Sequence, residues 1–207
     1  MTFLDNIVDD INWRTGQLAS LKFVIVHYQM AEEHKKMLIR YSVPSIYSLW
    51  EGFVRCSFQF YINEINSMRL RPDDVHISLR THAFSSNDKL VLENPRINFS
   101  TKKEFIETFF ECCENDFKVP TKLPTKSNVD FKVISDILLR FNLDLLPESF
   151  EKGLKKMLKF RNDIAHGEYS IPVIIDNVSE FSQLVIDLMS EIYDRIEKGY
   201  NNKTFLK

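Results

Sequence analysis

The sequence predicts an all-α protein, a bundle of four to six helices, and three observations support this fold class. Glycine is scarce, with 5 residues among 207, whereas phenylalanine is abundant, with 17. Few turn-forming residues and many large apolar side chains favour packed helices over a turn-rich β-architecture. Apolar residues also recur at spacings of three and four, the period of a helix with one buried face. We expect a single domain over residues 1–207, with an insertion at about 73–126 between the early helices and the later ones.

The N-terminal third predicts two helices separated at a proline. Residues 14–41 carry apolar side chains at helical spacing, with charged residues on the other side. Pro44 predicts a break, because proline has no amide donor for the helical hydrogen bond. A second apolar stripe predicts a helix over about 44–67, which should end before Arg71-Pro72.

The next segment, about 73–100, loses the helical period. Short apolar alternation at 75–79 predicts an irregular insertion, with a short β-hairpin as one form that it could take. Ser100 then predicts the start of a capped helix, since Glu104 follows at capping-box spacing.

The C-terminal half predicts three helices. Residues 127–141 return to the helical period. The next helix should run from Pro147 to near Gly167, because proline favours the first turn of a helix and glycine the position just after its end. Pro172 separates it from a last amphipathic helix over about 177–199.

Overall charge and cysteine usage restrict the class of protein. The formal net charge is −2, so whole-chain charge gives no support to non-specific polyanion binding, and any nucleic-acid site must come from local clustering. Three cysteines, two of them adjacent, are not the pattern of a disulfide framework, which favours a reducing compartment. The N-terminus has no signal-peptide pattern, and no apolar run reaches the roughly 18–20 residues of a membrane span. We expect a cytoplasmic protein that does not enter a membrane.

The candidate chemistry lies at the end of the helix that precedes Gly167. Arg161 and His166 are five residues apart, so on an ideal helix they start about 140° apart in direction and roughly 7.5 Å apart along the axis. They converge only if the last turn loosens, which Gly167 would permit, or if the arginine reaches along the axis. Asn162, four residues before the histidine, shares its face and could bond the imidazole or a phosphate.

These residue types suit phosphodiester chemistry. A histidine transfers protons near neutral pH, and an arginine fork can hold a phosphate. Residues 151–166 hold five Lys/Arg and two acids, a local excess of +3 that favours a nucleic-acid backbone. The candidate substrate-binding lysines are Lys155, Lys156 and Lys159. The spacing alone also allows a structural role, in which Arg161 and His166 only bond the last carbonyls of their helix.

The segment LKFRNDIAHGEY (158–169) resembles the signature of the HEPN superfamily: an arginine, a polar residue, three further positions and a histidine. The sequence of this segment is most similar to the prokaryotic HEPN group named for the MAE_28990 and MAE_18760 proteins. Three other stretches, at 48–62, 127–144 and 178–192, also resemble that group.

The resemblance implies an α-helical bundle that acts as a metal-independent endoribonuclease, with no cofactor. It implies a homodimer in which Arg and His of both protomers line one cleft, and a role as a toxin or an abortive-infection, anti-phage effector. Arg161 would then stabilise the phosphate, His166 would assist proton transfer, and Asn162 would orient the site. Attack by the 2′-hydroxyl of the RNA would leave a 2′,3′-cyclic phosphate.

Some HEPN toxins carry a modifiable tyrosine two positions after the histidine, where this chain has Glu168 and places Tyr169 one position later. Either another partner, such as an antitoxin protein, restrains the chain, or none does. Glu51 and Glu168 are candidate supporting carboxylates, and Glu51 could pair with Arg161 in a resting state. Two other classes stay open: a non-catalytic HEPN module that binds RNA or nucleotide as a sensor or adaptor, and a plain protein-interaction domain.

Overall fold

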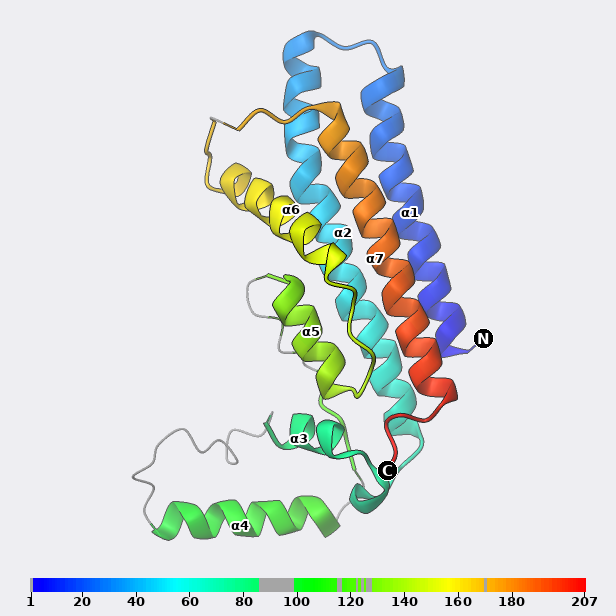
Figure 1. Cartoon of the computed structure of the whole chain (residues 1–207), viewed down its shortest axis with the longest axis vertical. Helices are drawn as coiled ribbons and strands as arrows, with labels where there is room; N and C mark the ends of the chain where they lie inside the picture. The colour runs from blue at the N-terminus through cyan, green and yellow to red at the C-terminus, as the bar shows by residue number, and fades with distance from the viewer. Residues whose placement is uncertain are drawn as a thin grey trace.

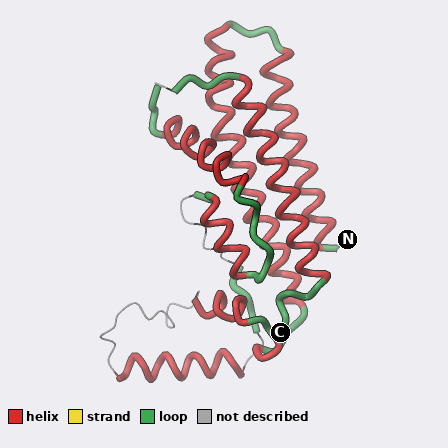
Figure 2. The backbone as a smooth tube through the Cα atoms, in the orientation of Figure 1, coloured by secondary structure: helices red, strands yellow, loops and turns green. Residues whose placement is uncertain are grey.

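The computed structural model describes residues 2–85, 99–114, 117–121, 123, 125, 128–169 and 171–207. These residues contain α-helices and one 3-10 turn: α1 (Phe3–His27), α2 (Glu32–Ser67), η1 (Pro72–Asp74), α3 (Ile77–Ser85), α4 (Phe99–Glu114), α5 (Phe131–Arg140), α6 (Ser149–Ala165) and α7 (Ile175–Asn201). Within these ranges there is no strand, only an isolated bridge between Val75 and Leu206. The predicted all-α class is confirmed (Figure 2), although the seven α-helices among the described residues exceed the four to six expected.

The first helix begins eleven residues before the predicted start at 14, because a capping box fixes its N-terminus. The Thr2 amide donates to the Asp5 carboxylate at 2.7 Å, and the Asp5 amide donates to the Thr2 hydroxyl at 3.1 Å. These two bonds satisfy donors that a helix start otherwise leaves unpaired.

The predicted break at Pro44 is wrong. α2 continues through that proline, and the chain turns instead at residues 28–31, which contain neither glycine nor proline. An internal proline costs a helix about 3 kcal/mol. Pro44 is flanked by Val43, Ile46 and Tyr47, all at most 1% exposed, and the burial of such side chains is worth about 1.5–3 kcal/mol each. Packing therefore outweighs the local penalty.

Three long helices, α1, α2 and α7, lie side by side and form the body of the molecule, and α6 crosses them obliquely (Figure 1). Each turns an apolar stripe inward. The largest side chains with under 2% exposure are Trp50, Tyr47, Tyr61, Phe53, Phe58, Phe141, Phe181 and Phe205. Most of the aromatic core thus comes from α2, which places this helix at the centre of the fold. None of the described helices combines the length and hydropathy that crossing a bilayer requires.

The insertion expected at about 73–100, irregular or with a short β-hairpin, is mostly helical where the structure describes it. Residues 77–85 form α3, and the preceding Val75 packs in the core at 0% exposure. The C-terminal residues hold this region in place, since the His76 amide donates to the Phe205 carbonyl at 2.8 Å and the Lys207 amide to the Asp74 carbonyl at 3.0 Å. α4 projects away from the bundle (Figure 1). The rest of the predicted irregular segment, residues 86–98, lies outside the described residues.

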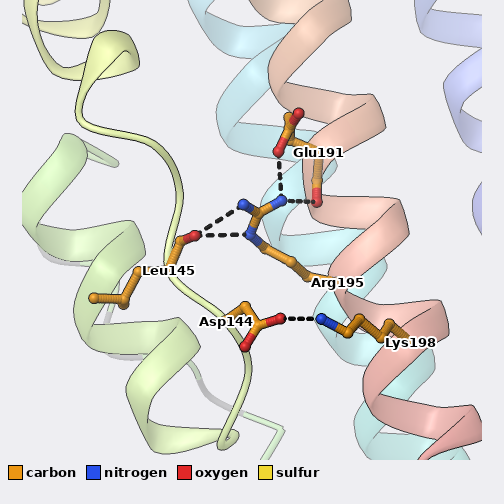
Figure 3. A network of polar contacts seen from close by, with 5 residues as sticks. All are labelled: Asp144, Leu145, Glu191, Arg195 and Lys198. Carbon is orange, nitrogen blue, oxygen red and sulfur yellow. Dashed lines mark hydrogen bonds and ion pairs between the residues drawn. The ribbon is translucent and has the colours of Figure 1, made fainter.

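The three C-terminal helices are confirmed close to their predicted bounds. α5 begins after Asp130, whose carboxylate accepts from the Val133 amide at 2.7 Å; Ser127, the predicted start, lies outside the described residues. The loop between α5 and α6 is tied to α7 (Figure 3). The Arg195 guanidinium donates twice to the Leu145 carbonyl, at 3.1 and 2.8 Å, and Lys198 pairs with Asp144. These contacts hold the loop that leads into α6 against α7.

Candidate active site

The C-terminus of α6 is the centre of the candidate site. Gly167 adopts φ +78°, its amide donates to the Ile164 carbonyl at 3.1 Å, and the Glu168 amide donates to the Asp163 carbonyl at 2.9 Å. These two bonds form a Schellman motif, the common closure of a helix by a left-handed glycine. The helix therefore stays regular through Ala165, and the loosened last turn that would bring Arg161 and His166 together within one chain is not present.

Arg161 turns inward, toward α2 and the segment that leads into α5. Its Nη1 donates to the side-chain oxygens of Asn128, at 3.1 Å, and of Asn162, at 2.9 Å. The guanidinium carbon lies 5.0 Å from the centre of the Tyr47 ring. A cation over an aromatic face is stabilised by roughly 0.5–2 kcal/mol. The arginine is thus half-buried in a fixed place, rather than loose on the surface.

Two buried aromatic residues of α2 hold the segment that contacts Arg161. The Val129 amide donates to the Tyr47 hydroxyl at 2.7 Å, and the Trp50 indole donates to the Val129 carbonyl at 3.0 Å. Burial raises the pKa of the Tyr47 phenol to about 12; the bond from Val129 opposes the shift, and nearby Glu51 adds to it. The phenol therefore stays neutral near pH 7 and acts as a support for the site.

His166 lies on the outside of α6, in line with two lysines. Seven residues turn a helix by about 700° and eleven by about 1100°, so Lys159 and Lys155 start within about 20° of the direction of His166. All three side chains are exposed, as is Lys152 on the same face one turn earlier. Among the described residues, the imidazole has no hydrogen-bond partner. We call Lys152, Lys155, Lys159 and His166 the α6 basic stripe.

The other predicted site residues make different contacts. Lys156 points toward α7, where it bonds both Glu180 oxygens at 2.7 and 2.9 Å. Glu51 forms an ion pair with Arg55, and Arg161 bonds the two asparagines instead. The Glu168 side chain is exposed. Asn162 lies where predicted, but its side-chain oxygen accepts from Arg161.

Arg40 of α2 is a residue near the site that sequence reasoning missed. Its Nη2 donates to the carbonyl of Glu168, and its Nη1 donates to that of Ile171 at 3.2 Å. Its guanidinium carbon lies 5.8 Å from the centre of the Tyr169 ring. Arg40 therefore fastens the loop that follows His166. Tyr47 and Asn128 were missed as well, because contacts between segments this distant in sequence leave no local pattern.

Gly167→Ala is expected to lower the free energy of unfolding by about 1 kcal/mol, because alanine is strained at a left-handed φ. Crowding is not the cause, since nothing lies within 4 Å of the position of an added Cβ. Gly16, inside α1, has equally open surroundings and no positive φ. Gly16→Ala should raise the same free energy by about 0.5–1 kcal/mol. Urea denaturation checks both, and equal shifts would contradict the assigned role of the Gly167 backbone.

Comparison with known proteins gives one match. The family model described as HEPN_MAE_28990/-like HEPN matches residues 3–205. No curated protein and no solved structure was found to match. The family match extends over nearly the whole chain, so α3 and α4 fall within the matched range as well.

Proposed function

The chain belongs to the HEPN_MAE_28990/-like HEPN family, and from this premise we propose that it is a metal-independent endoribonuclease. HEPN domains are often ribonucleases. The observation that carries the proposal for this member is the end of α6. There, a half-buried arginine fixed by Asn128 and Tyr47 lies five residues before a histidine that stands free at the end of a basic stripe.

The α6 basic stripe supports RNA as the substrate. Its three lysines run along one exposed face of the helix toward His166, and successive members rise by about 4.5 and 6 Å along the axis. Their positive charge favours a polyanionic backbone although the whole chain carries −2. We propose Lys155 and Lys159, together with Lys152, as substrate-binding residues. Lys156 contributes less to substrate binding in this proposal, because its charge is paired with that of Glu180.

The proposed reaction is an internal transesterification. A base removes the proton of a ribose 2′-hydroxyl, the 2′-oxygen attacks the adjacent phosphorus, and the bond from phosphorus to the 5′-oxygen breaks. The leaving oxygen takes a proton, which gives a 2′,3′-cyclic phosphate and a free 5′-hydroxyl. His166 is assigned to proton transfer, and Arg161 to the charge that develops on the phosphate. Asn162 orients Arg161 through the bond at 2.9 Å.

We propose that a second protomer of a homodimer completes this site. Arg161 points toward α2, whereas His166 faces outward from a regular helix, so the two do not converge within one chain. In a homodimer, the exposed histidine of one protomer could meet a phosphate held by the arginine of its partner. Mixing inactive Arg161→Ala and His166→Ala proteins, with subunit exchange, should then restore part of the activity. Light scattering that finds only monomers in an active sample would contradict the dimer.

From the proposed endoribonuclease activity we also propose a biological role, that of a toxin or an abortive-infection effector acting on RNA. With Glu168 two positions after the histidine, control by modification at that position is not available. Restraint would come from a separate antitoxin protein, if the chain has one. Purification of the chain with a co-expressed small neighbouring open reading frame would test this part.

One assay tests the activity itself. Purified protein is incubated with RNA in the presence of EDTA, and the products are examined for 2′,3′-cyclic phosphate ends. Cleavage with those ends supports the nuclease. RNA or nucleotide binding without cleavage would favour a sensor or adaptor module instead. Neither activity would leave a protein-interaction domain, in which Arg161 and His166 only stabilise the end of α6.

A further inference from the structure

Among the described residues, Tyr169 is the most exposed large apolar or aromatic side chain, at 92%. It lies three residues after His166, on the loop between α6 and α7. Three residues span at most about 11 Å, so the backbone of Tyr169 lies within about 11 Å of the backbone of His166, at the C-terminal end of the α6 basic stripe. A single exposed aromatic side chain is ordinary on a protein surface, so the case for a role depends on what lies around the ring.

Arg40 gives this ring a defined place. The guanidinium bonds the carbonyls on both sides of Tyr169, those of Glu168 and Ile171, and lies 5.8 Å from the ring centre. Arg40 itself is half-buried on α2, so the loop is fastened to the rigid centre of the bundle. One face of the ring is turned to the cation, and an exposure of 92% leaves the remainder open.

We infer that Tyr169, backed by Arg40, is a stacking platform for an unpaired nucleobase next to the phosphate at His166. The inference rests on the proposed action on RNA and adds a base-binding position to it. Proteins that bind single-stranded nucleic acid combine cations along the backbone with aromatic rings on which bases stack. Here the α6 basic stripe supplies the cations and Tyr169 supplies the ring.

The platform also defines the kind of RNA that the site takes. Every base has a flat π-face, so a stacking ring tolerates different bases and requires only that the base be unpaired. A base inside a duplex is already stacked on its neighbours. The site should therefore prefer single-stranded RNA, loops and ends over duplex RNA of the same length.

The test uses a ten-nucleotide single-stranded RNA that carries one 2-aminopurine, a base whose fluorescence falls when it stacks. Each ribose is 2′-O-methylated, so that the attacking hydroxyl is blocked and binding is measured without cleavage. Wild type should quench the probe. Tyr169→Ala should bind it roughly tenfold more weakly and lose the quenching, because stacking contributes about that much per base. Tyr169→Phe keeps the ring and should behave like wild type, whereas Arg40→Ala should weaken binding several-fold.

Phe99→Ala is the matched control. Phe99 is 82% exposed, and it begins α4, at the opposite end of the molecule from the α6–α7 loop (Figure 1). The control should bind the probe like wild type. Wild-type affinity and quenching in Tyr169→Ala, or an equal loss in Tyr169→Phe, would overturn the platform and leave the nuclease proposal standing. A wild-type protein that neither binds nor cuts RNA would overturn both.

Discussion

His166→Ala is expected to lower the rate of RNA cleavage by about 10²–10⁴-fold, the usual contribution of a positioned proton-transfer group. The free energy of unfolding should stay within about 0.5 kcal/mol of the wild-type value, because the side chain is exposed and makes no hydrogen bond among the described residues. The backbone at this position, φ −87° and ψ 4°, suits alanine as well. Initial rates of cleavage of a labelled RNA in EDTA, together with urea denaturation, measure both quantities.

His27→Ala is the matched control for this prediction. His27 is also an exposed histidine in the last turn of a helix, but it stacks on Phe23 at 4.2 Å at the end of α1, away from the α6 basic stripe. The His27→Ala variant should cleave RNA at the wild-type rate. If His166→Ala also kept the wild-type rate while the wild type was active, the histidine would have no part in the chemistry. A large loss of stability in His166→Ala would point to a structural role for the helix end instead.

The helices that could be predicted are those in which the spacing of apolar residues and the residues that start or stop a helix indicate the same bounds. α5, α6 and α7 combine an apolar stripe with nearby prolines, a capping aspartate or a terminal glycine, and local chemistry and packing favour the same bounds. The predicted break at Pro44 is wrong because one local rule conflicts with packing. Proline disfavours a helix interior, yet Tyr47 and Ile46 are buried against the rest of the bundle, and tertiary packing decides.

The prediction of an irregular or short β insertion at about 73–100 failed for a related reason. The alternation at 75–79 has the period of a strand, but a strand needs a partner along its whole length. Val75 finds only an isolated bridge to Leu206, and the chain continues as α3. Short apolar runs are compatible with either structure, and here the chain forms a helix from Ile77 onward.

The candidate site also has a part that local sequence predicts and a part that depends on tertiary contacts. Arg161 and His166 could be placed on one helix end from the sequence, because both belong to a local motif closed by Gly167. Their surroundings could not, since Asn128, Tyr47 and Arg40 reach them across the fold. A helical wheel does, however, already separate Lys156 from the face of His166, by about 80°. That signal was present in the sequence and would have excluded this lysine from the stripe.

Trp50→Ala should lower the free energy of unfolding by about 3–5 kcal/mol, the usual cost of emptying a large aromatic site in a core. Trp50 is 0% exposed, and the variant also leaves the Val129 carbonyl without its donor. Trp13, on α1, is 55% exposed, so Trp13→Ala should change the same free energy by no more than about 0.5 kcal/mol. Urea denaturation followed by circular dichroism compares the two without relying on tryptophan fluorescence. Similar losses in both variants would contradict the central position given to α2.

Trp50→Phe keeps a six-membered aromatic ring in the core but removes the indole donor, and it tests whether core and site share a support. The expected cost is about 1–3 kcal/mol, from the carbonyl of Val129 that loses its donor and from the smaller ring. Because Val129 follows Asn128, which accepts from Arg161, looser anchoring there should also let the guanidinium move. Cleavage by the folded variant should then fall well below wild type under conditions where it is fully native. If stability fell and the cleavage rate did not, the Asn128 segment would support only the fold, and Tyr47 with Asn162 would be enough to hold Arg161 in place.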